Sequence, residues 1–366
     1  MLKEEKGASK LVLIIIVFLL IIALIVLGFF VWYNLSLKEV QKDSQKVVIE
    51  IQEGSGISGI ADLLEQNGLI RSATAFKIYC RLNEDTAMQA GKYELDKNMS
   101  VEQIINELQN GNVVDETVTI TFVEGRNMRW IANTIAENTD NTEEDVYNLL
   151  LDEEYLDSLI EEYWFITDEI KNDDIYYSLE GYLYPDTYIL ANRSEDVRSI
   201  FKRMLDKTES VLDDYRTAIE ESDYTVHELL SLASVVELEA KNDEDRAEVA
   251  GVFYNRLNRG MALQSDVTTY YAFKIDMSER DLTADELSTD NPYNTRSSEM
   301  AGEIPVGPIC MVSETSIAAV VNPVQTDAIF FVADKNGKVY FSETNQEHEE
   351  KIQELKDEGL WYTYED

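Results

Sequence analysis

The chain has 366 residues, of which 45% are hydrophobic and 10% aromatic, so it can bury the core of more than one domain. Its formal net charge of −40 argues against a nucleic-acid-binding surface and predicts long-range repulsion from anionic polymers and lipids. With 2 histidines and 2 cysteines, no cluster has the spacing of a zinc site, and a disulfide framework is excluded. We therefore expect no metal and no cofactor.

Residues 11–33 form an uninterrupted apolar run that closes on Trp32 and Tyr33, which predicts a transmembrane helix with an aromatic pair at the interface. No small-residue cleavage site follows the run, so we expect an uncleaved anchor. Three lysines precede it and three follow it, at positions 3, 6 and 10 and at positions 38, 42 and 46. The short tail, residues 1–10, favours a cytoplasmic N-terminus and an acidic body on the outside.

After a polar stalk, residues 34–46, the chain contains an internal repeat at an offset of 71 residues: V-V-I-E-I-Q-E-G begins at Val47 and V-T-I-T-F-V-E-G at Val118. Each copy predicts a strand, a Glu-Gly turn and an amphipathic helix. Between the copies we expect a helix over 72–82, a strand around Tyr93, and a helix that begins with a capping box at Ser100. Residues 47–116 are thus predicted to be a small α+β module, either a LysM-like glycan-binding unit or a spacer.

The remaining chain is predicted to comprise the second repeat copy with an acidic helical connector, residues 117–175, and a mixed α+β domain, residues 176–366. Three tyrosines lie in S-L-E-G-Y-L-Y-P-D-T-Y, which Gly and Pro interrupt, and the last is Tyr188. Aromatic side chains on such an irregular segment can stack on sugar faces, although packed core loops use the same residues.

A buried helix is predicted to begin at the capping box of Thr225 and Glu228, because its residues from 229 to 236 are apolar almost all round. Glu237 lies on its last turns, where loss of hydration would favour the protonated acid. Glu239 lies roughly 200° further round, so at most one of the two can serve a given substrate atom. A solvated turn before Lys241 remains the alternative for both.

A second helix is predicted from the acidic cap at residues 242–245 to Arg259, ending at Gly260, with loops at 261–266 and 291–295. We expect a short helix over 316–322, a hairpin that turns at Asn336-Gly337, and a terminal acidic helix over 343–359 without visible chemistry. The overall fold prediction is α+β: one N-terminal transmembrane helix, a small LysM-like module and a mixed α+β catalytic domain.

Several motifs, in this order and spacing, resemble the endolytic murein transglycosylases, the MltG or YceG-like family, over essentially the whole chain. They are the N-terminal anchor, the duplicated module and E-G-Y-L-Y-P-D-T-Y, A-S-V-V-E-L-E-A, V-A-G-V-F-Y-N-R-L, G-M-A-L-Q-S-D-V-T, N-P-Y-N-T and P-V-G-P-I-C. Arg296 departs from the pattern, because a tyrosine is common there in the family.

The resemblance implies a bacterial membrane protein whose catalytic domain faces the cell wall. It would cut peptidoglycan between N-acetylmuramic acid and N-acetylglucosamine and leave 1,6-anhydro ends, with glycan strands and cell-wall synthesis enzymes as partners. It also implies that the catalytic acid is the first Glu of V-E-x-E, Glu237. We further expect sugar contacts from the side chains of Tyr188, Gln264, Asp266, Tyr293 and Asn294, and support from Glu239, Asn255 and Arg256.

Two rival functions remain at this point. A muramidase would use a second carboxylate, Asp266, to hold a water or act as nucleophile, and would leave reducing ends rather than anhydro ends. A wall-binding scaffold without catalytic activity would be unaffected by loss of Glu237.

Overall fold

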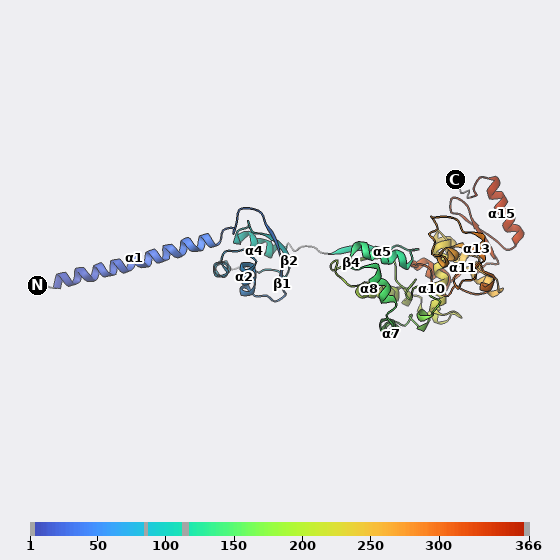
Figure 1. Ribbon diagram of the computed structural model, residues 1–366, viewed down its shortest axis with the longest axis horizontal. Coiled ribbons are helices and arrows are strands. Elements are labelled where there is room, and N and C mark those ends of the chain that lie inside the picture. The colour runs from blue at the N-terminus through green and yellow to red at the C-terminus, as the bar shows by residue number, and fades with distance from the viewer. Residues whose placement is uncertain (1–3, 84–86, 112–116, 362–366) are drawn as a thin grey trace. The chain divides into compact units, whose positions relative to one another are not determined.

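The computed structural model describes residues 4–83, 87–111 and 117–361, which divide into two compact units, Met1–Asp115 and Glu116–Asp366 (Figure 1). Each unit has a hydrophobic core of its own. Both units combine helices with small antiparallel sheets, so the predicted α+β class is confirmed.

The first unit begins with a long apolar helix, α1 (Glu4–Ser36). Within it, the 22 residues Ile15–Ser36 contain an 18-residue window with a mean hydropathy of 3.3, so the helix is long and apolar enough to cross a membrane by length and composition.

A small module follows α1 in the same unit. Strand β1 (Lys46–Ile51) pairs antiparallel with β2 (Gly91–Asp96), and helices α2 (Ile57–Gln66), α3 (Ala73–Leu82) and α4 (Val101–Asn110) complete it. The capping box at Ser100 is confirmed, and α4 ends at Gly111, whose φ of 66° is left-handed. Tyr93 and Phe76 are fully buried in this core.

The predicted repeat is confirmed in the backbone. In the second unit, β3 (Val118–Thr121) and α5 (Met128–Asn138) repeat the order of β1 and α2. The turn glycine of each copy, Gly54 or Gly125, has a positive φ, of 80° and 74°. A side chain is disfavoured at such a φ, which explains why both copies carry Gly after Glu.

The second unit is mostly helical around two short sheets. Its β3 pairs with β4 (Thr187–Leu190), and β5 (Phe330–Ala333) pairs with β6 (Val339–Ser342). The other elements, in chain order, are α6 (Glu143–Leu150), α7 (Glu153–Glu162), the 3-10 helix η1 (Asp168–Lys171), α8 (Val197–Asp213), α9 (Arg216–Glu220), α10 (Val226–Glu239), α11 (Asp243–Asn258), α12 (Asp266–Ala272), α13 (Ala284–Ser288), the 3-10 helix η2 (Ser298–Met300), α14 (Glu314–Val321) and α15 (Asn345–Asp357).

Helix α10 lies in the core of this unit and packs against α11 and α14, which also contact each other. The predicted hairpin is β5–β6, and its turn residue Gly337 has a φ of 86°. Two local predictions need correction. Helix α14 begins two residues earlier than expected, because Ser313 rather than a later residue caps it. Asn242 precedes α11, but its side chain bonds to Asp245 and to the Gly337 carbonyl instead of capping the helix.

Candidate active site

The predicted capping box and burial of α10 are both confirmed. The Thr225 side chain accepts a hydrogen bond from the Glu228 amide, and the Glu228 side chain accepts one from the Thr225 amide. From Leu229 to Glu237 every residue is buried. The helix therefore carries its two terminal glutamates out of a rigid, packed segment.

Glu237 lies in a polar network, and the prediction of apolar surroundings for its carboxylate is wrong. The whole residue is 8% exposed. One carboxylate oxygen lies 2.8 Å from Nη2 of Arg246. The other accepts hydrogen bonds from the Ser313 amide at 2.9 Å, the Ser313 hydroxyl, and the Ser316 hydroxyl at 2.7 Å. The Glu237 side chain is thus paired with Arg246 on one side and bonded to the first residues at the N-terminus of α14 on the other.

Glu239 leaves α10 on a different side and lines a cavity of about 500 Å³. Its residue is half-buried, and its carboxylate accepts a hydrogen bond from the Ser265 hydroxyl. Burial raises the pKa of Glu239, and the negative charge of Asp266 raises it further, while the Ser265 bond and two arginines act in the opposite direction. The raised pKa that sequence analysis expected at Glu237 is thus found at Glu239.

The cavity is bounded by segments far apart in sequence. The loop before α12 contributes Gln264, α12 contributes Asp266 and Val267, and the C-terminal elements β5 and α15 supply the opposite wall. Phe330 and Trp361 add aromatic surface there. Such flat apolar groups are suited to packing against the faces of sugar rings.

Charged groups hold the rim of this cavity in place. Asp266 is ion-paired with Arg296. Arg256 donates to the carbonyls of Leu263 and Ile329, each at 2.7 Å, and so joins the loop to the hairpin strand. Gln264 adopts a left-handed φ of 57°, which places an exposed amide side chain on the cavity wall.

The structure places four other expected site residues away from the cavity lining. Tyr188 is 9% exposed, lies in β4, and packs edge-on against Phe122. Tyr293 is fully buried against Tyr176 and Tyr271. These aromatic side chains are core residues, so the expected sugar contacts are corrected.

Asn294 and Asn255 likewise bond to protein rather than to a ligand site. The Asn294 side chain is fully buried and donates to the backbone carbonyls of residues 286 and 289 at 3.0 and 2.7 Å. Asn255 donates to the Thr326 and Ala328 carbonyls at 2.7 and 3.0 Å. Asn255 braces the loop before β5, whereas Asn294 shapes its own loop.

Glu180 is a buried titratable group that sequence analysis did not single out, although it lies in the quoted motif E-G-Y-L-Y-P. It is 1% exposed, and its carboxylate accepts bonds from the Met128 amide and the Tyr271 hydroxyl, all at 2.9 Å. Burial raises the pKa of Glu180 to about 7, against the effect of those two bonds. Glu180 does not line the Glu239 cavity, nor a second pocket formed by Trp130 and its neighbours, and is therefore a core residue.

Within the described ranges, no group of three or more His, Cys, Asp or Glu side chains is arranged to hold a metal ion. The arrangement at Glu239 instead provides one acid with a raised pKa, two further carboxylates, two arginines and an aromatic wall beside an open cavity. These groups can transfer a proton to and from a neutral, ring-containing substrate.

Comparisons with known proteins agree on one family. The family model described as YceG-like matches residues 49–354. An endolytic murein transglycosylase of Bacillus subtilis (strain 168) is 37% identical over 327 residues, covering 89% of this chain and 89% of the relative. One of Streptococcus pneumoniae serotype 2 (strain D39 / NCTC 7466) is 33% identical over 359 residues, covering 93% of this chain and 64% of the relative. A 2.6 Å crystal structure of a yceG-like protein from Listeria monocytogenes matches with a TM-score of 0.60 and 34% identity, over 84% of this chain and 100% of that one.

Proposed function

The chain belongs to the YceG-like family of endolytic murein transglycosylases, and from this premise we propose that it cleaves peptidoglycan glycan strands with Glu239 as its acid and base. The observation that carries this proposal is the difference between the two glutamates of α10. Glu239 has a raised pKa and lines an open cavity. Both carboxyl oxygens of Glu237 are instead bonded to Arg246 and to residues at the start of α14. A general acid must reach its substrate and hold a proton.

The proposed reaction needs only one carboxylic acid. Glu239 donates its proton to the glycosidic oxygen between N-acetylmuramic acid and N-acetylglucosamine as the bond from C1 to that oxygen breaks. The substrate's N-acetyl group stabilises the positive charge that develops at C1. The Glu239 carboxylate then takes the proton of the C6 hydroxyl as the C6 oxygen bonds to C1. The product is a 1,6-anhydro ring, and Glu239 regains its proton.

The cavity suggests a place for the sugars. Phe330 and Trp361 offer apolar faces, and Gln264 and Arg296 offer donors to hydroxyl and N-acetyl groups. Phe330, Trp361 and Arg296 replace Tyr188, Tyr293 and Asn294 in the proposed substrate contacts, and the expected contacts from Gln264 and Asp266 are kept.

The N-terminal unit extends the proposal to location and partners. Helix α1 would anchor the protein in the cytoplasmic membrane, with residues 1–10 inside and the catalytic unit on the cell-wall side. The module of β1, β2 and their helices would bind glycan as a LysM-like unit. In this position the enzyme would act on nascent strands beside cell-wall synthesis enzymes.

The alternative is a muramidase, because Asp266 lines the same cavity as Glu239 and its charge acts on the Glu239 carboxyl. In that reaction Asp266 would orient a water or attack C1, and the new end would be reducing. The Asp266–Arg296 ion pair holds this carboxylate to one side of the cavity, which favours the transglycosylase.

The test is mass spectrometry of the products of the full-length protein, in detergent, on uncrosslinked glycan strands. Anhydro ends are expected from the native protein, no products from Glu239→Gln, and anhydro ends again from Glu237→Gln. Reducing ends would establish the muramidase. Products from Glu239→Gln at the native rate would remove Glu239 from the mechanism. No products from the native protein would support the scaffold.

A further inference from the structure

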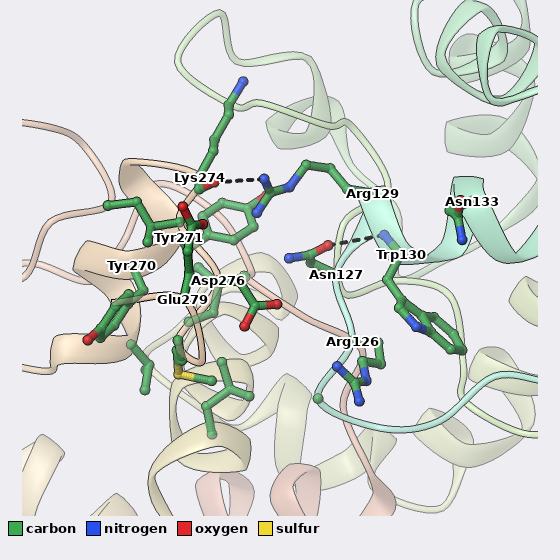
Figure 2. A pocket seen from close by; sticks show the side chains of 16 residues that line it. Arg126, Asn127, Arg129, Trp130, Asn133, Tyr270, Tyr271, Lys274, Asp276 and Glu279 are labelled. Carbon is green, nitrogen blue, oxygen red and sulfur yellow. Dashed lines mark hydrogen bonds between the residues drawn. The ribbon is translucent and has the colours of Figure 1, made fainter. Parts of the chain in front are cut away.

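A second pocket, of about 430 Å³, lies between the start of α5 and the end of α12 (Figure 2). One wall is the Glu-Gly turn of the second repeat copy and the start of α5, which carry Arg126, Asn127, Arg129 and Trp130. The other wall is the end of α12 and the loop after it. The proposed cleavage reaction uses none of these residues.

The charges in this pocket are mixed, in a chain that is otherwise strongly acidic. Arg126 and Arg129 line one side, and Asp276 and Glu279 line the other. Two hydrogen bonds from Ser278 lower the pKa of Asp276, with smaller help from the two arginines, so this carboxylate is an anion at neutral pH. The pocket therefore offers both an anion-binding and a cation-binding side.

Specific contacts hold the two walls of this pocket in place. Arg129 donates from Nη1 to the Lys274 carbonyl at 2.9 Å, which ties α5 to the loop after α12 (Figure 2). The Arg126 guanidinium lies 5.8 Å from the centre of the Trp130 ring, within reach of a cation–π contact. Arg126 is exposed and has no ion-pair partner among the described residues. Its charge is open to a ligand.

Two residues connect this pocket with the proposed active site. Val267 lines both cavities, and Leu238, the neighbour of Glu239 on α10, lines the second pocket. Helix α12 is the shared wall, with Asp266 towards Glu239 and Tyr271 towards the second pocket. Its 7 residues give a length of roughly 10 Å, about the span of three extended residues of peptide.

We propose that the second pocket binds the peptide stem of the glycan strand that Glu239 cleaves. This inference rests on the proposed function. A stem branches from the lactyl group of muramic acid and carries carboxylates and a diamino acid. Arg126 and Arg129 would receive a carboxylate of the stem, and Asp276 and Glu279 the ammonium of its diamino acid. Trp130 would cover the aliphatic part.

The mixed charge separates this ligand from the other candidates. An unsubstituted glycan has no charge for Arg126 or Asp276 to pair with. A phosphate polymer would meet the two arginines but would be repelled by Asp276 and Glu279 at the same pocket. A peptide that carries both signs satisfies both walls.

The experiment compares two substrates with the full-length protein in detergent: uncrosslinked strands with their stems, and the same strands after an amidase has removed the stems. We expect kcat/KM to be about 10-fold higher on the stem-bearing strands, which is the effect of roughly one charge-assisted contact. Arg126→Glu should remove that preference and leave cleavage of stripped strands unchanged. Arg259→Glu, an exposed charge reversal at the end of α11 and outside both cavities, should keep the preference.

A binding measurement separates failure of this inference from failure of the proposed function. Calorimetry with the Glu239→Gln protein compares a disaccharide-peptide with the bare disaccharide, and needs no cleavage. Tighter binding of the peptide form that Arg126→Glu abolishes supports the pocket, even if the native protein cleaves nothing. Three results would overturn the stem proposal: equal binding of both ligands, equal cleavage of both kinds of strand, or an equal loss of cleavage on both kinds of strand in Arg126→Glu. The Glu239 proposal would still stand wherever cleavage occurs.

Discussion

Glu237 and Glu239 are two residues apart on α10, yet their carboxylates enter different environments: one an ion pair with Arg246, the other an open cavity. A separation of two residues turns a side chain by roughly 200° on a helix. The first glutamate therefore points towards α11 and α14, and the second towards the loop before α12. This difference assigns the glutamates different tasks.

Loss of the proposed acid should cost far more activity than its size suggests. We expect Glu239→Gln to lower kcat by about 10²–10⁴-fold, the usual contribution of a positioned acid or base, with little change in the free energy of unfolding. Cleavage of uncrosslinked strands and urea unfolding measure the two effects. Ser265→Ala is a useful companion, because it removes only the hydrogen bond to the carboxylate. A Glu239→Gln protein with native kcat contradicts the assignment.

The Glu237–Arg246 pair should behave as a stabilising element. Removing one partner of a buried pair leaves the other charge unpaired, so Glu237→Ala should lower the free energy of unfolding by about 3–5 kcal/mol. The double substitution Glu237→Leu with Arg246→Met should be less damaging than the sum of the two single changes. Urea unfolding of the four proteins completes the cycle, and strict additivity would show that the pair is not coupled.

The glutamates also show where sequence reasoning succeeded. The capping box at Thr225 and the apolar run after it predicted the position and burial of α10, because both signals are local. The repeat at Val47 and Val118 could also be recognised from the sequence, since a strand, a Gly turn and an amphipathic helix each have a short-range residue pattern. The predicted burial of α10 did not identify the hydrogen-bond partners of its glutamates. The polar groups around Glu237 come from residue 246, on the next helix, and from residues 313 and 316, far away in sequence.

The pH dependence of cleavage should respond to Arg296. The positive charge of Arg296 lowers the pKa of Glu239, so Arg296→Gln should raise it, and protonated Glu239 should persist to higher pH. We expect the basic limb of the kcat/KM profile to move upwards. Arg259→Gln serves as the control, because this exposed arginine lies outside the cavity lining. A limb that stays in place, or moves to lower pH, would mean that another group titrates there.

Glu180 should make the protein less stable as the pH rises. Its pKa of about 7 in the folded protein exceeds the ordinary value of 4.5, so the folded state binds more protons than the unfolded state between these values. The free energy of unfolding then falls as the pH rises through that window, by roughly 3 kcal/mol at most. In Glu180→Gln, which imitates the protonated acid, this fall should disappear.

Urea unfolding at pH 5 and pH 8, followed by tryptophan fluorescence, measures the Glu180 effect. The exposed Glu299→Gln is the matched control and should keep the native pH dependence. If Glu180→Gln loses stability between pH 5 and pH 8 as the native protein does, the dependence arises elsewhere.

Gly181 should tolerate no side chain. Its φ is 77°, and a Cβ built on it would lie 2.2 Å from Cβ of Pro308. Gly181→Ala should therefore cost about 1–2 kcal/mol for the left-handed backbone, plus the displacement of the Pro308 loop. Gly260→Ala is matched in backbone, with a φ of 64° and nothing within 4 Å, and should show the backbone cost alone. Equal losses in the two variants would exclude the contact with Pro308.

The candidate site could not be predicted fully, because its second wall comes from elements that carry no recognisable chemistry. The terminal acidic helix was expected to carry no visible chemistry, yet α15 and β5 line the same cavity as Asp266. Which glutamate opens into a cavity depends on that wall. Tyr188 and Tyr293 illustrate the reverse case: their irregular, aromatic segments suit either a sugar platform or a core, and only packing distinguishes the two.

The pairing of β3 with β4 has a practical consequence for anyone dividing this protein. Val118 lies opposite Leu190, so the first strand of the second unit finds its partner 72 positions later. A fragment that starts at residue 176 would lack β3 and present β4 as a bare edge, with Tyr188 and Leu190 stripped of their cover. Such a fragment is expected to self-associate, whereas one that begins ahead of Val118 keeps the strand pair whole.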